Sequence, residues 1–215
     1  VGDLAGWSGG GLGDINGDGV DDIGIGALQA DPDGVDGAGA AYVVFGGQTG
    51  VAPSLASLDG ANGFRIDGLA GASTPYSLHS AGDLNADGLD DLVLTSLGEN
   101  GGDGAAYVVY GRSDGFAASL DVSQIDGANG FRIGGSLGEG MGVSARGLGD
   151  VNGDGMDDLI VGAFLADGGG RFNAGQSYVI FGSAAGFAAD FDVNTLDGSN
   201  GFWIKGAATS DSSGF

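Results

Sequence analysis

The feature that most limits how this chain can fold is an acidic nine-residue segment that occurs three times. At residues 14–22 it reads Asp-Ile-Asn-Gly-Asp-Gly-Val-Asp-Asp, and it returns at 83–91 and 150–158. The copies start 69 and 67 residues apart (83 − 14 and 150 − 83), and the segments around them repeat in step. Self-similarity at a fixed period marks an array of equal structural units, each packed on its neighbours. We therefore predict a repeat protein.

Each copy carries the side-chain oxygens of a calcium loop. Asp or Asn occupies positions one, three, five and nine, position six is glycine, and position seven is apolar and can offer only its carbonyl. A hard cation such as Ca²⁺ binds six to eight such oxygens at roughly 2.3–2.6 Å. We expect one Ca²⁺ per loop, or about three per chain. The expected ligands are Asp14, Asn16, Asp18, Val20 and Asp22; Asp83, Asn85, Asp87, Leu89 and Asp91; and Asp150, Asn152, Asp154, Met156 and Asp158.

Two other structures compete for this segment. An EF-hand needs a Glu at position twelve and flanking helices. Position twelve is apolar in all three copies, and short apolar runs typical of buried strands follow the loops. A simple Asp-Gly hairpin turn would explain one copy, but not three that all keep four side-chain oxygens. By alternation, the position-eight residues should point into solvent, so that Asp90→Ala has little effect. These residues are Asp21, Asp90 and Asp157.

Composition and spacing predict an all-β fold. Fifty glycines oppose long helices, whereas 42% hydrophobic residues can bury a core. Each repeat shows four short strand-like segments, which suits β-propeller blades of four antiparallel strands. The expected units are 1–70, 71–137 and 138–208, with 209–215 as the start of a further repeat. The expected strands after the loops are 22–27, 91–96 and 158–163; the second set is 41–45, 106–110 and 177–181; the third is 64–66, 131–133 and 202–204; and the set before the loops is 7–11, 76–80 and 142–146.

The charge balance limits the partners. Six basic and 29 acidic residues give a formal charge of −23, which disfavours nucleic acid and anionic membranes and favours cations. There is no cysteine, and bound metal could replace disulfides in an extracellular protein. No signal peptide or membrane-spanning run is visible, and we expect an extracellular or cell-surface location without membrane insertion.

The repeats resemble a known family. The pattern Asp-x-(Asp/Asn)-x-Asp-Gly-x-x-Asp is the calcium signature of FG-GAP repeats, and Gly26-Ala27 and Gly162-Ala163 match the Gly-Ala that follows it. The name-giving Phe-Gly is replaced here, and Thr95-Ser96 replaces Gly-Ala in the middle repeat. The resemblance implies the propeller fold of integrin α-subunits and related bacterial surface and exported proteins. It also implies that the calcium ions are structural supports, away from the ligand-binding face.

These observations suggest a calcium-binding, non-catalytic propeller segment of an extracellular or cell-surface bacterial protein, acting in adhesion or as a scaffold. Two alternatives remain: the propeller of a secreted hydrolase acting on polysaccharide or phospholipid, and a pure structural spacer. No catalytic residue is expected, because the only histidine, His79, lacks a Ser/Asp pairing. Expected partners are calcium and a protein or glycan ligand. Three blades are fewer than the four to eight that usually close a propeller. We therefore also expect a head-to-tail dimer or further repeats in a longer chain; the alternative is a stable three-blade arc.

Overall fold

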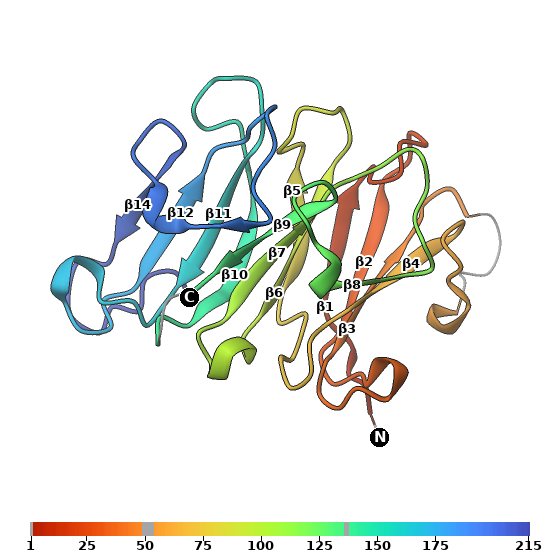
Figure 1. Cartoon of the computed structure of the whole chain (residues 1–215), viewed down its shortest axis with the longest axis horizontal. Helices are drawn as coiled ribbons and strands as arrows, with labels where there is room; N and C mark the ends of the chain where they lie inside the picture. The colour runs from red at the N-terminus through yellow and green to blue at the C-terminus, as the bar shows by residue number, and fades with distance from the viewer. Residues whose placement is uncertain (1, 49–53, 136–137) are drawn as a thin grey trace.

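The structure, a computed structural model, describes residues 2–48, 54–135 and 138–215 as three mainly antiparallel sheets that follow one another along the chain (Figure 1). The strand orders are β1-β2-β3-β4-β8, β5-β6-β7-β9-β13 and β10-β11-β12-β14. The predicted fold class of four-stranded antiparallel blades is confirmed. The predicted boundary between the second and third units, at residue 137, lies outside the described residues.

The strands lie close to their predicted positions. The first sheet contains β1 (Ala5–Gly13), β2 (Asp22–Ala27), β3 (Ala40–Val44) and β4 (Gly63–Asp67). The second contains β5 (Leu78–Gly82), β6 (Asp91–Ser96), β7 (Ala105–Val109) and β9 (Gly130–Gly134). The third contains β10 (Met141–Gly149), β11 (Asp158–Ala163), β12 (Gln176–Ile180) and β14 (Gly201–Lys205). The 3-10 turns are η1 (Pro32–Gly34), η2 (Leu55–Ser57), η3 (Glu99–Gly101), η4 (Val122–Gln124), η5 (Gly168–Gly170) and η6 (Val193–Thr195).

Two short strands were not predicted from the sequence. β8 (Ser119–Asp121) belongs to the second repeat but pairs in parallel with β4 of the first sheet. β13 (Asp190–Phe191) of the third repeat pairs in the same way with β9. Phe116, just before β8, stacks on Phe64 with ring centroids 4.2 Å apart. The second and third repeats therefore each cover the edge strand of the preceding sheet.

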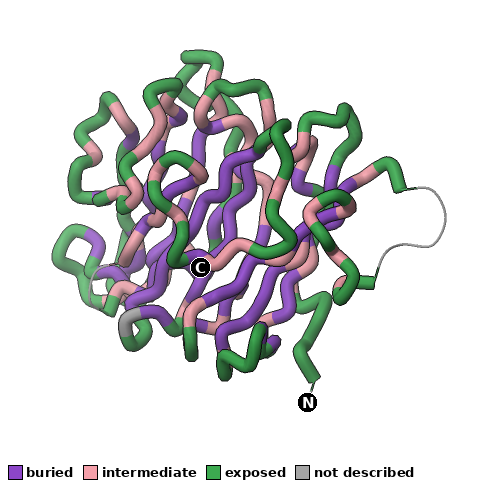
Figure 2. The backbone as a smooth tube through the Cα atoms, turned by 45° about the vertical axis from the view of Figure 1, so that its right-hand side comes forward, coloured by how far each residue is buried: buried purple, intermediate pink, exposed green. Residues whose placement is uncertain are grey.

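The hydrophobic core lies between the sheets. One cluster joins the first and second sheets and includes Leu12, Phe64 and Leu92, and another joins the second and third. The inner strands are largely buried while most connections are exposed, and β1 and β14 at the two ends of the array are mostly exposed (Figure 2). β5 contacts β1 on one side and β10 on the other, which aligns the first strands of the three sheets. Among the described residues, no helix is both long and apolar enough to cross a membrane.

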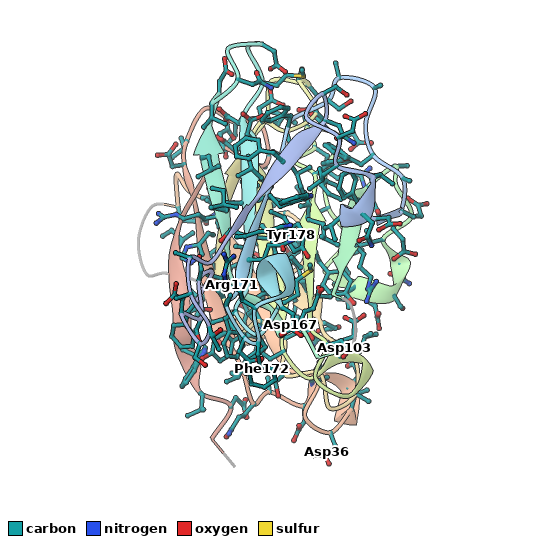
Figure 3. The ribbon with its side chains drawn as sticks, turned by 90° about the vertical axis from the view of Figure 1, so that its left-hand side faces the viewer. Asp36, Asp103, Asp167, Arg171, Phe172 and Tyr178 are labelled. Atoms are coloured by element: carbon teal, nitrogen blue, oxygen red, sulfur yellow. The ribbon has the colours of Figure 1, made fainter. Side chains whose placement is uncertain are left out.

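The three acidic loops share one end of the molecule. Each joins the first strand of a sheet to the second, and all three lie along the upper edge of Figure 1. The connections between the second and third strands lie at the opposite end. Figure 3 shows Asp36, Asp103 and Asp167, one from each of those connections, in the half away from the acidic loops.

Candidate calcium loops

Each acidic loop folds around the carboxylate of its first residue. In the first loop, the Asp14 carboxylate accepts hydrogen bonds from the backbone N–H groups of Gly17 (2.8 Å), Asp18 (3.1 Å) and Gly19 (2.8 Å). The Asn16 side-chain oxygen accepts from Asp18 N–H (2.8 Å), and its amide donates to the Asp18 carboxylate (3.1 Å). Asp83 and Asp150 organise their loops in the same way. The predicted side-chain ligands at positions one, three and five therefore come together in all three loops.

The position-nine aspartates are buried at the base of each loop. Asp22, Asp91 and Asp158 are 0% exposed. One oxygen of each accepts the N–H of the second loop residue (2.8–3.0 Å). The other accepts the N–H of the glycine two residues after the end of the sheet's third strand (2.8–3.0 Å). This carboxylate therefore fixes the loop to its own sheet.

Burial makes two of these carboxyl groups weak acids without a cation. Burial, with a smaller contribution from Asp18 and Asp14, raises the pKa of Asp22 to about 6. Burial, with a smaller contribution from Asp87 and Asp83, raises the pKa of Asp91 to about 8. A divalent cation in the loop would reverse this effect, because opposite charge favours the ionised carboxylate.

The donor set fits calcium, although the side chains do not surround a common point. Among the described residues, no group of three or more His, Cys, Asp or Glu side chains is arranged to hold a metal ion. The acidic oxygens instead accept backbone N–H groups of their own loops. Ca²⁺ prefers oxygen ligands of the kinds that each loop offers: carboxylates, an amide oxygen and a backbone carbonyl, in a loop that turns at a glycine. An ion bound here would be held by positions one, three, five, seven and nine.

The expectation for the position-eight aspartates is wrong in two loops. The Asp90 carboxylate accepts the backbone N–H of Asp14 (2.9 Å), and the Asp90 N–H donates to the Asp14 carbonyl (3.2 Å). Asp157 binds Asp83 in the same way, at 3.0 and 3.2 Å. Strand alternation placed these side chains in solvent, but the adjacent sheet lies within their reach. We call this double contact the inter-blade clasp.

The clasp carboxylate lies close to the glycine that directly precedes the contacted loop. A Cβ added at Gly13 would lie 2.1 Å from the Asp90 carboxylate, and one added at Gly82 would lie 2.1 Å from the Asp157 carboxylate. Gly149, at the same position in the third sheet, has no heavy atom closer than 4.0 Å. All three glycines have φ between +73° and +78°. The signal in the sequence was the Asp at position eight of every copy.

Several charged residues outside the acidic loops pair with one another. Arg65 pairs with Asp67 (2.5 Å) and Asp33 (2.8 Å). Glu99 accepts from the Tyr107 hydroxyl (2.5 Å) and pairs with a neighbouring arginine. These acidic residues therefore serve in ion pairs and hydrogen bonds.

His79 lies in a polar cavity of about 350 Å³ between the first strands of the sheets. Burial, helped by the charge of Arg146, lowers its pKa. Asp90 and Asp157 also line this cavity, but both are already engaged in clasps. Ser80 lines the cavity as well, and its hydroxyl oxygen accepts the Gly82 N–H (3.1 Å).

A family model described as "FG-GAP repeat" matches residues 74–109 and 143–180. These two segments contain the second and third acidic loops. These two segments are FG-GAP repeats. The matched residues run from the first strand of a sheet, through the loop, to the end of its third strand, so the FG-GAP match covers the calcium candidates of both sheets.

The chain is similar to integrin alpha chains and to a phospholipase D. The chain is 40% identical to integrin alpha pat-2 of Caenorhabditis elegans over 91 residues, covering 41% of this chain and 7% of that protein. It is 28% identical to integrin alpha-4 of Xenopus laevis over 160 residues, covering 72% and 14%. It is also 28% identical to phosphatidylinositol-glycan-specific phospholipase D of Rattus norvegicus over 163 residues, covering 74% and 18%. The chain spans less than a fifth of each of these relatives.

Proposed function

We propose that this chain is a calcium-stabilised, non-catalytic propeller segment that serves adhesion or acts as a scaffold in an extracellular or cell-surface protein. The observation that carries the proposal is the triplicated loop, in which the same carboxylate and amide oxygens are organised by the same backbone N–H groups. The similarity to integrin α chains supports the extracellular setting.

Calcium would act as a structural support rather than as a catalyst. In each loop the ion would offset repulsion among three carboxylates, one of which is completely buried. A cation that binds only the folded state stabilises that state by RT ln(1 + [Ca²⁺]/Kd), about 2.7 kcal/mol per site at a hundredfold excess over Kd. The ions would thus take the place of disulfides, which the sequence lacks.

Calorimetric titration with Ca²⁺, combined with thermal unfolding in chelator, tests the proposal. We expect about three ions per chain, weaker binding of Mg²⁺, and a much lower melting temperature in chelator. Asp87→Ala should weaken the middle site and lower the melting temperature in calcium. Asp36→Ala removes an equal charge at the far end of the molecule (Figure 3) and is the matched control. A stoichiometry near zero would overturn the calcium proposal.

A second candidate function is the propeller of a hydrolase. It rests on the similarity to phosphatidylinositol-glycan-specific phospholipase D, which covers 74% of this chain. Incubation of the calcium-loaded protein with a phosphatidylinositol-glycan substrate separates the two functions. The scaffold proposal expects no cleavage. Cleavage that disappears when an acid outside the loops is substituted, with the melting temperature unchanged, would favour the enzyme.

A further inference from the structure

The three acidic loops differ in the residue that follows the asparagine at position three. The pairs are Asn16-Gly17, Asn85-Ala86 and Asn152-Gly153. Ala86 adopts φ +60°, a left-handed conformation that glycine adopts freely and that strains a residue with a Cβ. The first and third loops meet the same backbone demand with glycine, at φ +77° and +83°. The expected calcium ligands do not explain the alanine, because position four contributes none of them.

In the first loop, the contacts around Asn16 bring together the groups that react when an asparagine loses its amide. The Asn16 amide oxygen accepts the Asp18 N–H (2.8 Å), and its amide nitrogen donates to the Asp18 carboxylate (3.1 Å). These bonds turn the side chain forward, along the peptide bond that follows it. The nitrogen of that bond belongs to Gly17, and its N–H donates to the Asp14 carboxylate (2.8 Å). The loop thus holds an amide, a backbone nucleophile and a proton acceptor together.

The third loop repeats these contacts. The Asn152 oxygen accepts the Asp154 N–H (2.8 Å), and the Asn152 nitrogen donates to the Asp154 carboxylate (2.8 Å). The Gly153 N–H donates to the Asp150 carboxylate (2.6 Å). Gly17 and Gly153 are both exposed, in loops along the upper edge of Figure 1, so water has access to them.

The middle loop keeps the forward-facing amide but lacks the other features. Asn85 makes the same two bonds to Asp87, at 3.0 and 2.9 Å. The Asp83 carboxylate accepts the N–H groups of Asp87 and Gly88 but, among the described residues, not that of Ala86. The Ala86 methyl group also crowds the nitrogen beside it, whereas a glycine leaves the nitrogen open. The middle loop therefore has neither the proton acceptor nor the unhindered nucleophile.

Three other Asn-Gly pairs hold the amide in the opposite direction. In the turn before β4, the Asn62 oxygen accepts the Asp59 N–H, and the Asn62 nitrogen donates to the Ser57 carbonyl, both at 3.1 Å. The turns before β9 and β14 make the same backward bonds. The glycine of each pair is a buried strand residue. The pairs are Asn62-Gly63, Asn129-Gly130 and Asn200-Gly201.

We propose that Asn16 and Asn152 are sites of spontaneous deamidation in the ion-free protein, and that the alanine at position four protects the middle loop. In the first loop, the Gly17 nitrogen bonds to the amide carbon of Asn16. Its proton passes to the Asp14 carboxylate and on to the leaving nitrogen, and the C–Nδ2 bond breaks to release ammonia. Water then opens the succinimide ring at either carbonyl and gives aspartate or isoaspartate. Water is the only co-reactant, and nothing is oxidised or reduced.

Isoaspartate would disable the loop in which it forms. It adds one main-chain carbon between positions three and four, so the N–H groups of Asp18 and Gly19 would no longer meet the Asp14 carboxylate as they do now. The middle loop takes part in both inter-blade clasps. Alanine at position four therefore protects the loop on which both clasps depend.

Peptide mass spectrometry of the whole chain, kept folded in chelator at mildly alkaline pH, tests the proposal. The amide should be lost at Asn16 and Asn152 and kept at Asn85. It should also be kept at the turn asparagines, Asn62, Asn129 and Asn200. In urea the turn asparagines should lose their amides too, because unfolding frees both the side chain and the following glycine. The chelator keeps the result independent of calcium binding.

Three results would each overturn the proposal. They are loop asparagines that stay intact in the folded chain, equal losses at the loop and turn asparagines of the folded chain, and turn asparagines that stay intact in urea.

Exchanging the residues at position four provides matched variants. Ala86→Gly should start the loss of amide at Asn85, and it relieves the left-handed strain at that position. Gly153→Ala should stop the loss at Asn152, while Asn16 of the same chain reacts as before. A Cβ added at Gly153 meets no heavy atom within 4 Å, and urea unfolding in chelator checks that both variants fold. An Asn85 that stays intact in the first variant, or an Asn152 that reacts as in the wild type in the second, would contradict the role given to position four.

Discussion

The first and middle acidic loops carry matching ligand residues but differ in what holds their position-eight aspartates. Asp90 of the middle loop reaches across to Asp14, whereas Asp21 of the first loop is exposed and makes no clasp within the described residues. The same pattern of acidic residues therefore gives a solvated charge in one loop and a link between sheets in the other. The comparison shows that a position in a repeat acquires its role from the neighbouring repeat.

The largest effect is expected at the glycine that faces the clasp. Gly13→Ala places a Cβ 2.1 Å from the Asp90 carboxylate and adds left-handed backbone strain at φ +78°. Left-handed strain costs about 1–2 kcal/mol, and a lost hydrogen bond to a charged group costs about 1.5–3 kcal/mol. We expect a loss of about 3–5 kcal/mol in the free energy of unfolding, measured with urea.

Gly149→Ala is the matched control, because it adopts φ +73° with no clasp beside it. It should lose only the strain contribution of about 1–2 kcal/mol. Equal losses for Gly13→Ala and Gly149→Ala would show that the clasp does not restrict which residue can stand at position 13.

The next effect separates the two aspartates directly. Asp90→Ala removes the acceptor of the Asp14 N–H, and the free energy of unfolding in calcium should fall by about 1.5–3 kcal/mol. Asp21→Ala removes an exposed charge and should stay within about 0.5 kcal/mol of the wild type. Thermal or urea unfolding of both variants, measured side by side, provides the test. Equal shifts would contradict the clasp.

The sequence predicted what repeats and missed what joins the repeats. Apolar runs fixed β2, β6 and β11 to the residue, because each begins at a position-nine aspartate of the repeated loop. Loop spacing also identified the ligand candidates. β8 and β13 escaped prediction because their pairing partners lie in the preceding repeat, about 55 residues or more away. Strand alternation likewise placed Asp90 in solvent, since it describes one strand and takes no account of the neighbouring sheet.

The last effect concerns protons in the absence of calcium, and it again contrasts the two loops. Asp91 lies between two neighbouring sheets, and burial raises its pKa to about 8, whereas that of Asp22 rises only to about 6. In chelator, the folded protein should take up a proton at Asp91 as the pH falls below about 8. The unfolded chain does so only near the ordinary value of 3.8.

The free energy of unfolding in chelator should therefore rise as the pH falls from about 8 to about 6, by less than the limit of about 1.4 kcal/mol per pH unit for one proton. Urea unfolding at several pH values measures the slope. Asp91→Asn should flatten the slope in this window, while Asp22→Asn should leave it, because Asp22 takes up its proton only below about pH 6. Saturating calcium should abolish the slope in the wild type, since the ion keeps the carboxylate ionised. If Asp91→Asn leaves the slope in chelator unchanged, Asp91 does not have the raised pKa, and its burial does not distinguish it from Asp22.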